Sequence, residues 1–215
     1  MSTQATSKTF GRHAYALILA FVFSPAALLV SGCGEEQTRV EPRSETDRSP
    51  RKTEKAASPI SERAFRDAAF KGHIETVRQA IEQGVDVNTS DSDGRTALLL
   101  ASYEGHTNVA RLLLEHKAST NHRDAAGRTA LMYAASGPNH ETVRVLLEAG
   151  AAPDVIDKGE RFTALMFAAA EGQQEVVRVL LRHNADVTLR DIDGDTARDF
   201  AAKNGHNKIV RILGK

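Results

Sequence analysis

The side chains that could carry nucleophilic or metal chemistry in this 215-residue chain are one cysteine, Cys33, and eight histidines. His73, His106 and His206 each follow a glycine at the spacing of an internal repeat, so we expect them to occupy turns rather than a metal site. No two histidines have the i, i+4 spacing of the HExxH zinc motif. A single thiol also excludes a disulfide framework and a cysteine-rich zinc module. The sequence therefore predicts no catalytic residues, no metal site and no cofactor, and we expect the protein not to be an enzyme.

Two acidic stretches have the alternating carboxylates of a calcium loop. They are Asp91-Ser92-Asp93-Gly94 and Asp191-Ile192-Asp193-Gly194-Asp195. Neither stretch supplies the ordered ligands, the glycine at position six and the bidentate glutamate at position twelve that an EF-hand needs. Aspartate and glycine are common in tight turns, so we interpret both stretches as hairpin turns.

Cys33 ends an N-terminal segment with the pattern of a secretory signal. Lys8 and Arg12 precede an apolar run over residues 14–30, and no acidic residue appears before Glu35. An uncleaved transmembrane helix is the less favoured alternative, because the run contains a proline and falls at or below the roughly 20 residues needed to cross a bilayer. We therefore expect the segment to direct export and to be removed.

The residues Val30-Ser31-Gly32-Cys33 resemble the lipobox of bacterial lipoproteins. In that family the cysteine thiol receives a diacylglyceryl group, the signal is cut just before it, and the new amino terminus is usually acylated. The resemblance implies a signal peptide over residues 1–32 and a lipid on Cys33 that attaches the protein to a membrane stably, as two or more acyl chains do. Gly34 is not the aspartate that commonly retains enteric lipoproteins at the inner membrane. The resemblance thus favours the periplasmic face of the outer membrane.

The segment after the cysteine has the composition of a tether. Residues 34–59 contain six basic residues, six acidic residues and three prolines, and almost no large apolar side chain. With Cys33 they form a predicted disordered tether, residues 33–59, whose reach as a flexible coil is roughly 25–30 Å. Removing the two basic residues of the signal and the six and six of the tether from the 28 and 28 of the chain leaves 20 basic and 22 acidic residues. That net charge of −2 gives no support to nucleic-acid binding.

An internal repeat covers the remainder of the chain. Thr96, Thr129, Thr163 and Thr196 recur at spacings of 33, 34 and 33 residues. Each threonine can cap a first helix, because its side-chain oxygen can accept a hydrogen bond from an unpaired backbone N–H. A turn and a second apolar segment follow in every copy, and a degenerate first copy begins near Ile60.

Leucines of the repeat are placed to fill the seams between copies. They are Leu98, Leu131 and Leu165 in the first segments, and Leu113, Leu146 and Leu180 in the second. No single copy can bury that surface alone, so stability must come from the stacking of neighbours. The last copy has Arg198 and Asp199 where other copies have apolar residues, which is suited to a polar end cap.

These features resemble the ankyrin repeat across the chain from residue 60 to residue 215. The resemblance implies an all-α solenoid of about five helix-turn-helix repeats with hairpin loops. Its expected repeats are about 60–91, 92–124, 125–157, 158–191 and 192–215. The proline that usually follows the threonine is alanine here, and the hairpin from Asp157 to Phe162 carries one extra residue and an aromatic side chain. That hairpin is either a binding feature or a harmless insertion.

Ankyrin proteins usually contact partners through their concave face, at the hairpin tips and the exposed residues before the Gly-His turn. Transferred position by position, the resemblance implies that the partner-binding residues are Phe70, Arg95, Tyr103, Glu104, Arg128, Arg161, Phe162 and Ile192. The arginines, Tyr103 and Phe162 are the expected hot spots, because such side chains combine a large contact area with directed hydrogen bonds.

Three functions remain from the sequence. The leading one is a membrane-anchored, monomeric scaffold that binds another protein in the bacterial cell envelope. The alternative is a periplasmic immunity-type inhibitor of a toxin or lipase, a role that some secreted ankyrin proteins fill. An enzyme is the third and weakest. A neighbouring gene for a toxin or lipase would favour immunity, and one for an envelope enzyme would favour a scaffold.

Overall fold

The computed structural model describes residues 59–214, which contain ten helices in five consecutive pairs. We name the first helix of each pair inner and the second outer. The inner helices are α2 (Glu62–Phe70), α4 (Ala97–Tyr103), α6 (Ala130–Ala135), α8 (Ala164–Ala170) and α10 (Ala197–Lys203). The outer helices are α3 (Ile74–Glu82), α5 (Thr107–Glu115), α7 (His140–Glu148), α9 (Gln174–Arg182) and α11 (Asn207–Leu213). The predicted signal peptide, Cys33 and nearly all of the predicted tether lie outside the described residues.

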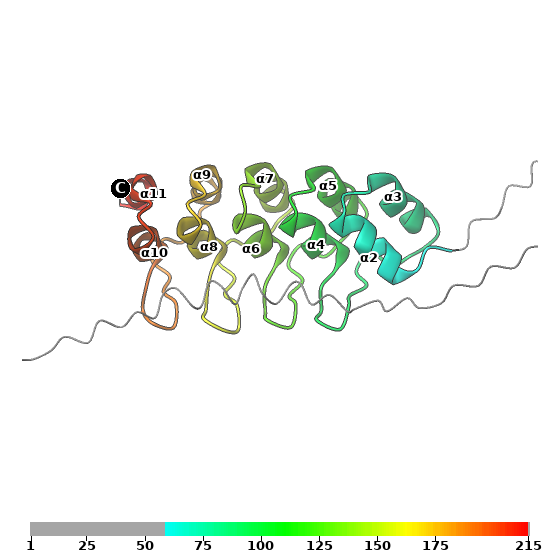
Figure 1. Cartoon of the computed structure of the whole chain (residues 1–215), viewed down its shortest axis with the longest axis horizontal. Coiled ribbons are helices and arrows are strands. Elements are labelled where there is room, and N and C mark those ends of the chain that lie inside the picture. Colours follow the sequence, from blue (N-terminus) through cyan, green and yellow to red (C-terminus); the bar gives the residue numbers. More distant parts are fainter. Residues whose placement is uncertain (1–58, 215) are drawn as a thin grey trace, which may run out of the picture. The chain divides into compact units, whose positions relative to one another are not determined.

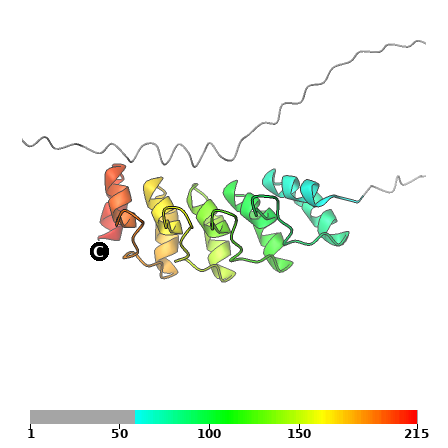
Figure 2. The same ribbon diagram turned by 90° about the horizontal axis from the view of Figure 1, so that it is seen from below.

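The five pairs stack side by side in two layers. Figure 1 shows the inner helices in one layer and the outer helices in the other, with hairpin loops extending beyond the inner layer. Figure 2 shows that these hairpins all lie on the same side of the stack. Within residues 59–214 the only β-type pairing is an isolated bridge between Ser90 and Thr96. The predicted all-α solenoid of about five repeats is confirmed.

Four of the five inner helices begin at the capping threonines that the sequence indicated. In α4 the hydroxyl of Thr96 accepts a hydrogen bond from the backbone N–H of Leu99 at 3.4 Å. Equivalent bonds are made by Thr129, Thr163 and Thr196 at the starts of α6, α8 and α10. Ser61 caps α2 in the same way, accepting from the N–H of Ala64 at 3.2 Å. Each cap satisfies a backbone donor that the helix itself leaves unpaired.

The core is a continuous seam of leucine and alanine. All six leucines predicted to fill it are at most 1 % exposed. The inner-helix alanines that allow close approach of the layers are also buried; they are Ala68, Ala101, Ala134, Ala168 and Ala201. Since the inner helices of consecutive repeats pack against one another, burial depends on stacking and not on any single helix pair.

Side chains at the turns between inner and outer helices connect each repeat to the one before it. His106 Nε2 lies 3.0 Å from the carbonyl oxygen of Phe70, and His206 Nε2 lies 3.0 Å from that of Ala170. In the third repeat Asn139 takes the place of this histidine, and its side-chain amide donates to the carbonyl of Tyr103 at 3.3 Å. These bonds satisfy carbonyl groups at the ends of inner helices, where no helical donor remains.

The two ends of the stack are polar. At the C-terminal end Arg198 is exposed and Asp199 is half-buried. At the N-terminal end α2 exposes Arg63 and Asp67, whose charged groups lie 3.9 Å apart. None of the helices within residues 59–214 has the length and apolar character that a membrane span requires.

Candidate partner-binding site

We call the surface formed by the four hairpins and the adjoining inner helices the hairpin face. Its hairpins are residues 91–95, 124–128, 157–162 and 191–195. Backbone hydrogen bonds join consecutive hairpins: the N–H groups of Ala125, Lys158 and Ile192 donate to the preceding hairpin at 2.9 to 3.0 Å. The hairpins therefore present their side chains from a connected backbone rather than from independent loops.

An aspartate closes each hairpin. Asp91 Oδ1 accepts hydrogen bonds from the backbone N–H groups of Asp93 at 3.0 Å and Arg95 at 2.8 Å. The first residue of every other hairpin accepts an equivalent bond; these are Asp124, Asp157 and Asp191. The interpretation of the two acidic stretches as turns is confirmed by these bonds.

The two hairpin arginines that precede a capping threonine have different partners. Arg95 Nε donates to Asp91 at 2.8 Å, and its Nη2 lies 3.2 Å from Asp93. Burial of Asp91 opposes ionisation, but the hydrogen bonds from Arg95 outweigh it and hold the pKa of Asp91 below its ordinary value. The charge of Arg95 is therefore neutralised within its own hairpin.

Arg128, one repeat later, is paired with the next hairpin instead of its own. Its Nε lies 3.7 Å from the buried carboxylate of Asp157, and its guanidinium lies over the ring of Phe167 at 5.7 Å from the centroid. The carboxylate of Asp124 accepts a hydrogen bond from the hydroxyl of Tyr133 at 2.7 Å. Burial and this bond raise the pKa of Tyr133 above its ordinary value, and Arg128 acts in the opposite direction.

The hairpin with the extra residue changes the place of Phe162. In the other three hairpins the residue before the last is a glycine with positive φ, whereas here it is Arg161, with φ of 64°. Phe162 then occupies the position of Arg95 and Arg128. It is only 6 % exposed, so the expectation of an exposed contact residue is wrong. Its apolar ring enters the interior, where the arginines at the same position keep charged groups near the surface.

The buried ring of Phe162 joins an aromatic group along the inner helices. It makes edge-to-face contacts with Phe167 and Phe200, with ring centroids 5.5 and 5.1 Å apart. Tyr103 and Tyr133 form a similar contact at 5.9 Å, and both remain half-buried. Such pairs hold rings in defined orientations.

Three members of this group were not predicted as site residues. Tyr133, Phe167 and Phe200 each stand four residues after a capping threonine, so they share one position of the repeat. That spacing was the signal available in the sequence, because one helical position repeated in every copy produces a row along the stack. Tyr133 is the partly exposed member of this row, while Phe167 and Phe200 are buried.

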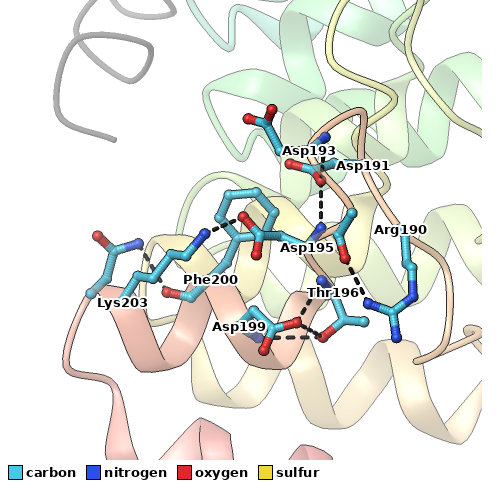
Figure 3. Close-up of polar contacts among 10 residues, drawn as sticks. Arg190, Asp191, Asp193, Asp195, Thr196, Asp199, Phe200 and Lys203 are labelled. Carbon is cyan, nitrogen blue, oxygen red and sulfur yellow. Dashed lines mark hydrogen bonds and ion pairs between the residues drawn. The ribbon is translucent and has the colours of Figure 1, made fainter. Parts of the chain in front are cut away.

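The last hairpin carries the strongest negative charge. Its residue equivalent to Arg95 is Asp195, so three carboxylates lie in the turn, as Figure 3 shows. Lys203 pairs with Asp195, and Arg190 donates to the backbone carbonyl of Gly194 at 2.6 Å. Ile192 at the tip is 63 % exposed, in agreement with its predicted surface position.

A second polar feature of the last repeat lies at the start of α10 (Figure 3). Asp199 accepts hydrogen bonds from the backbone N–H of Thr196 at 2.9 Å and from its hydroxyl at 2.7 Å. These bonds lower the pKa of Asp199. Asp199 therefore completes a capping box, a role beyond the polar end cap that the sequence indicated.

The remaining predicted contact residues lie along the hairpin face but do not form one cluster. Glu104 and Arg161 are exposed, and Phe70 is half-buried at the end of α2. Within residues 59–214 no group of three or more histidine, cysteine, aspartate or glutamate side chains is arranged to hold a metal ion. The expectation that the turn histidines are structural is confirmed for His106 and His206 by their bonds to the preceding repeat.

Stacked helix pairs with connected hairpins define a helical-repeat solenoid whose long face is suited to contacts with another macromolecule. The family model of ankyrin repeats in three copies matches residues 65–157 and again residues 139–215. The chain belongs to the ankyrin-repeat family, whose repeats are protein–protein interaction modules. No curated protein matches the chain.

Proposed function

We propose that this protein is a lipid-anchored, monomeric scaffold of the bacterial cell envelope, which binds another protein through its hairpin face. A lipid on Cys33 would hold it at the periplasmic side of the outer membrane. The observation that carries the binding role is the set of partly exposed aromatic and arginine side chains on that face: Arg95, Tyr103, Arg128 and Tyr133.

The hairpin face has the chemistry of a protein interface. Tyrosine and arginine are enriched among residues that dominate binding energy. Here Tyr103 and Tyr133 restrain each other by ring contact, and Arg95 is held by two carboxylates. Side chains that are already ordered lose less conformational entropy when a partner binds.

Support for the anchor comes from the sequence. The four residues ending at Cys33 resemble a lipobox, and the charged segment that follows has the composition of a spacer. A tether of roughly 25–30 Å would leave the hairpin face accessible to a second envelope protein.

The binding role is tested by capture from an envelope extract. The Tyr103→Ala, Arg128→Ala double variant should retain less than a tenth of the partner that the unchanged protein retains, since each anchor contributes about 2 kcal/mol. Arg178→Ala is the matched control, because Arg178 is half exposed on α9, and the outer helices form the layer farther from the hairpins (Figure 1). Equal capture by the double variant, or a loss with the control, would move the binding site away from the hairpin face.

The anchor is tested separately by Cys33→Ser. We expect this variant to leave the membrane fraction and to appear in the soluble periplasm. Unchanged membrane association and unchanged mobility of the mature chain would refute lipidation while leaving the binding role intact.

A further inference from the structure

Arg128 is the hairpin arginine before a capping threonine whose guanidinium makes no hydrogen bond to a carboxylate within the described repeats. Its Nε is buried and has no hydrogen-bond partner there. The side chain is nevertheless 21 % exposed, and it lies over the ring of Phe167. Two polar neighbours interact with it: Asp157 forms a long ion pair at 3.7 Å while accepting from the N–H of Phe162, and the Tyr133 hydroxyl, which donates to Asp124, also interacts with the guanidinium.

The comparison with Arg95 shows why Arg128 lacks a hydrogen-bonded carboxylate in its own hairpin. At Arg95 the hairpin offers two carboxylates, those of Asp91 and Asp93, and both pair with the guanidinium. At Arg128 the residue equivalent to Asp93 is Ala126, and the equivalent of Asp91 is engaged by the Tyr133 hydroxyl. An arginine has five N–H donors in a fixed planar arrangement, so most of those of Arg128 remain available.

We propose that Arg128 is the anchor for a carboxylate group of the protein partner, an aspartate or glutamate side chain in an extended acidic segment. The proposal rests on the proposed function and names the chemistry of its partner. A guanidinium held against an aromatic ring keeps its edge for a carboxylate, which it binds with two parallel hydrogen bonds. Partial burial strengthens such a bond because water competes less for the donors.

The charge of the hairpins favours an acidic ligand at this point of the face. Residues 123–128 contain Arg123 and Arg128 against Asp124, a net of +1. Residues 190–195 contain one arginine against three aspartates, a net of −2 (Figure 3). An acidic segment is therefore attracted to the second hairpin and repelled by the fourth, which fixes where along the stack it binds.

The test is a selection of peptides from a random library displayed on phage, with the full chain held in dodecylmaltoside micelles as the target. We expect the selected peptides to share an acidic position. Parallel selections on Arg128→Gln and Arg178→Gln provide the matched pair: the first should lose the shared acidic position and the second, on outer helix α9, should keep it.

A selected peptide then gives the measurement, by fluorescence anisotropy. Arg128→Gln should weaken its binding at least tenfold, and replacing its shared glutamate or aspartate by the amide should weaken binding by a similar factor. The two changes together should cost no more than either alone, because both remove the same contact. Arg178→Gln, on outer helix α9, should change the affinity less than twofold, which separates loss of this contact from a general effect of removing a surface arginine.

The outcomes distinguish the two proposals. Selected peptides that share no acidic position, or that bind Arg128→Gln unchanged, would overturn the role of Arg128 and leave the proposed function standing. If no selected peptide binds at the hairpin face, this would count against the proposed function and against the role of Arg128 together.

Discussion

The residue after the C-cap of each full-length outer helix has left-handed backbone, and this predicts a stabilising substitution. The four residues recur at spacings of 33, 33 and 34: Gly84 with φ of 86°, Lys117 with 68°, Gly150 with 88° and Asn184 with 60°. Helices commonly end with such a residue, and glycine is the usual choice because it has no Cβ. Lys117 is the member least suited to this conformation. We therefore expect Lys117→Gly to raise the free energy of unfolding.

The size of the effect follows from two opposing contributions. Left-handed backbone costs a non-glycine residue roughly 1–2 kcal/mol in the folded state. Glycine also increases the conformational entropy of the unfolded chain, which lowers the free energy of unfolding by about 0.4–1 kcal/mol. The net gain is about 1 kcal/mol, or about 2–4 °C in Tm for a protein of this size. Little else changes, because the side chain of Lys117 is exposed and its backbone N–H still donates to Leu114 at 3.0 Å.

Urea unfolding followed by circular dichroism measures this gain as a higher midpoint with an unchanged slope. Gly150→Lys is the matched reverse change: a Cβ there meets nothing within 4 Å, so only the backbone conformation is penalised. It should lower the free energy of unfolding by about 1 kcal/mol. A lower midpoint for Lys117→Gly, or no effect of either change, would refute the conformational reasoning.

Three further predictions concern buried or half-buried groups. Ser102→Ala should raise the free energy of unfolding by about 1 kcal/mol in urea, because the buried hydroxyl has no hydrogen-bond partner within residues 59–214; a loss of stability would reveal a missed partner. Leu146→Ala should lower it by about 2–5 kcal/mol, since this fully buried side chain fills a seam between repeats, and a loss below 1 kcal/mol would contradict that packing. The pKa of Tyr133 is raised in the folded protein, so the unfolded chain loses this proton at lower pH and the free energy of unfolding falls as the pH rises above about 10. The urea midpoint should therefore fall less with pH for Tyr133→Phe than for the unchanged protein, and an identical fall in both would exclude this contribution.

Most of the fold could be predicted from the sequence because the repeat combines several independent signals. The spacing of Thr96, Thr129 and Thr163 located the helix starts, and the caps they form are local hydrogen bonds. The buried leucines followed from the same periodicity. At these positions the local preference for a helix cap and the burial required by stacking favour the same structure.

The site was less predictable because it depends on how the backbone of one hairpin accommodates an extra residue. The extra residue between Asp157 and Phe162 was visible, but its length alone did not show that Arg161 would take the left-handed position. That choice moves Phe162 into the interior and against Phe200 of the next repeat. The surroundings of Arg128 could not be predicted either, since they depend on the Tyr133 hydroxyl, which donates to the carboxylate of Asp124, and on an ion pair with Asp157 of the next hairpin.

The distinction between the two faces of the stack gives the most direct test of the central claim. A photoreactive amino acid can replace Glu104, which is exposed beside Tyr103 at the end of inner helix α4, or Arg178 on outer helix α9. After irradiation of living cells, we predict a covalent adduct with one envelope protein from position 104 and none from position 178. An adduct from position 178 with none from position 104 would contradict binding through the hairpin face.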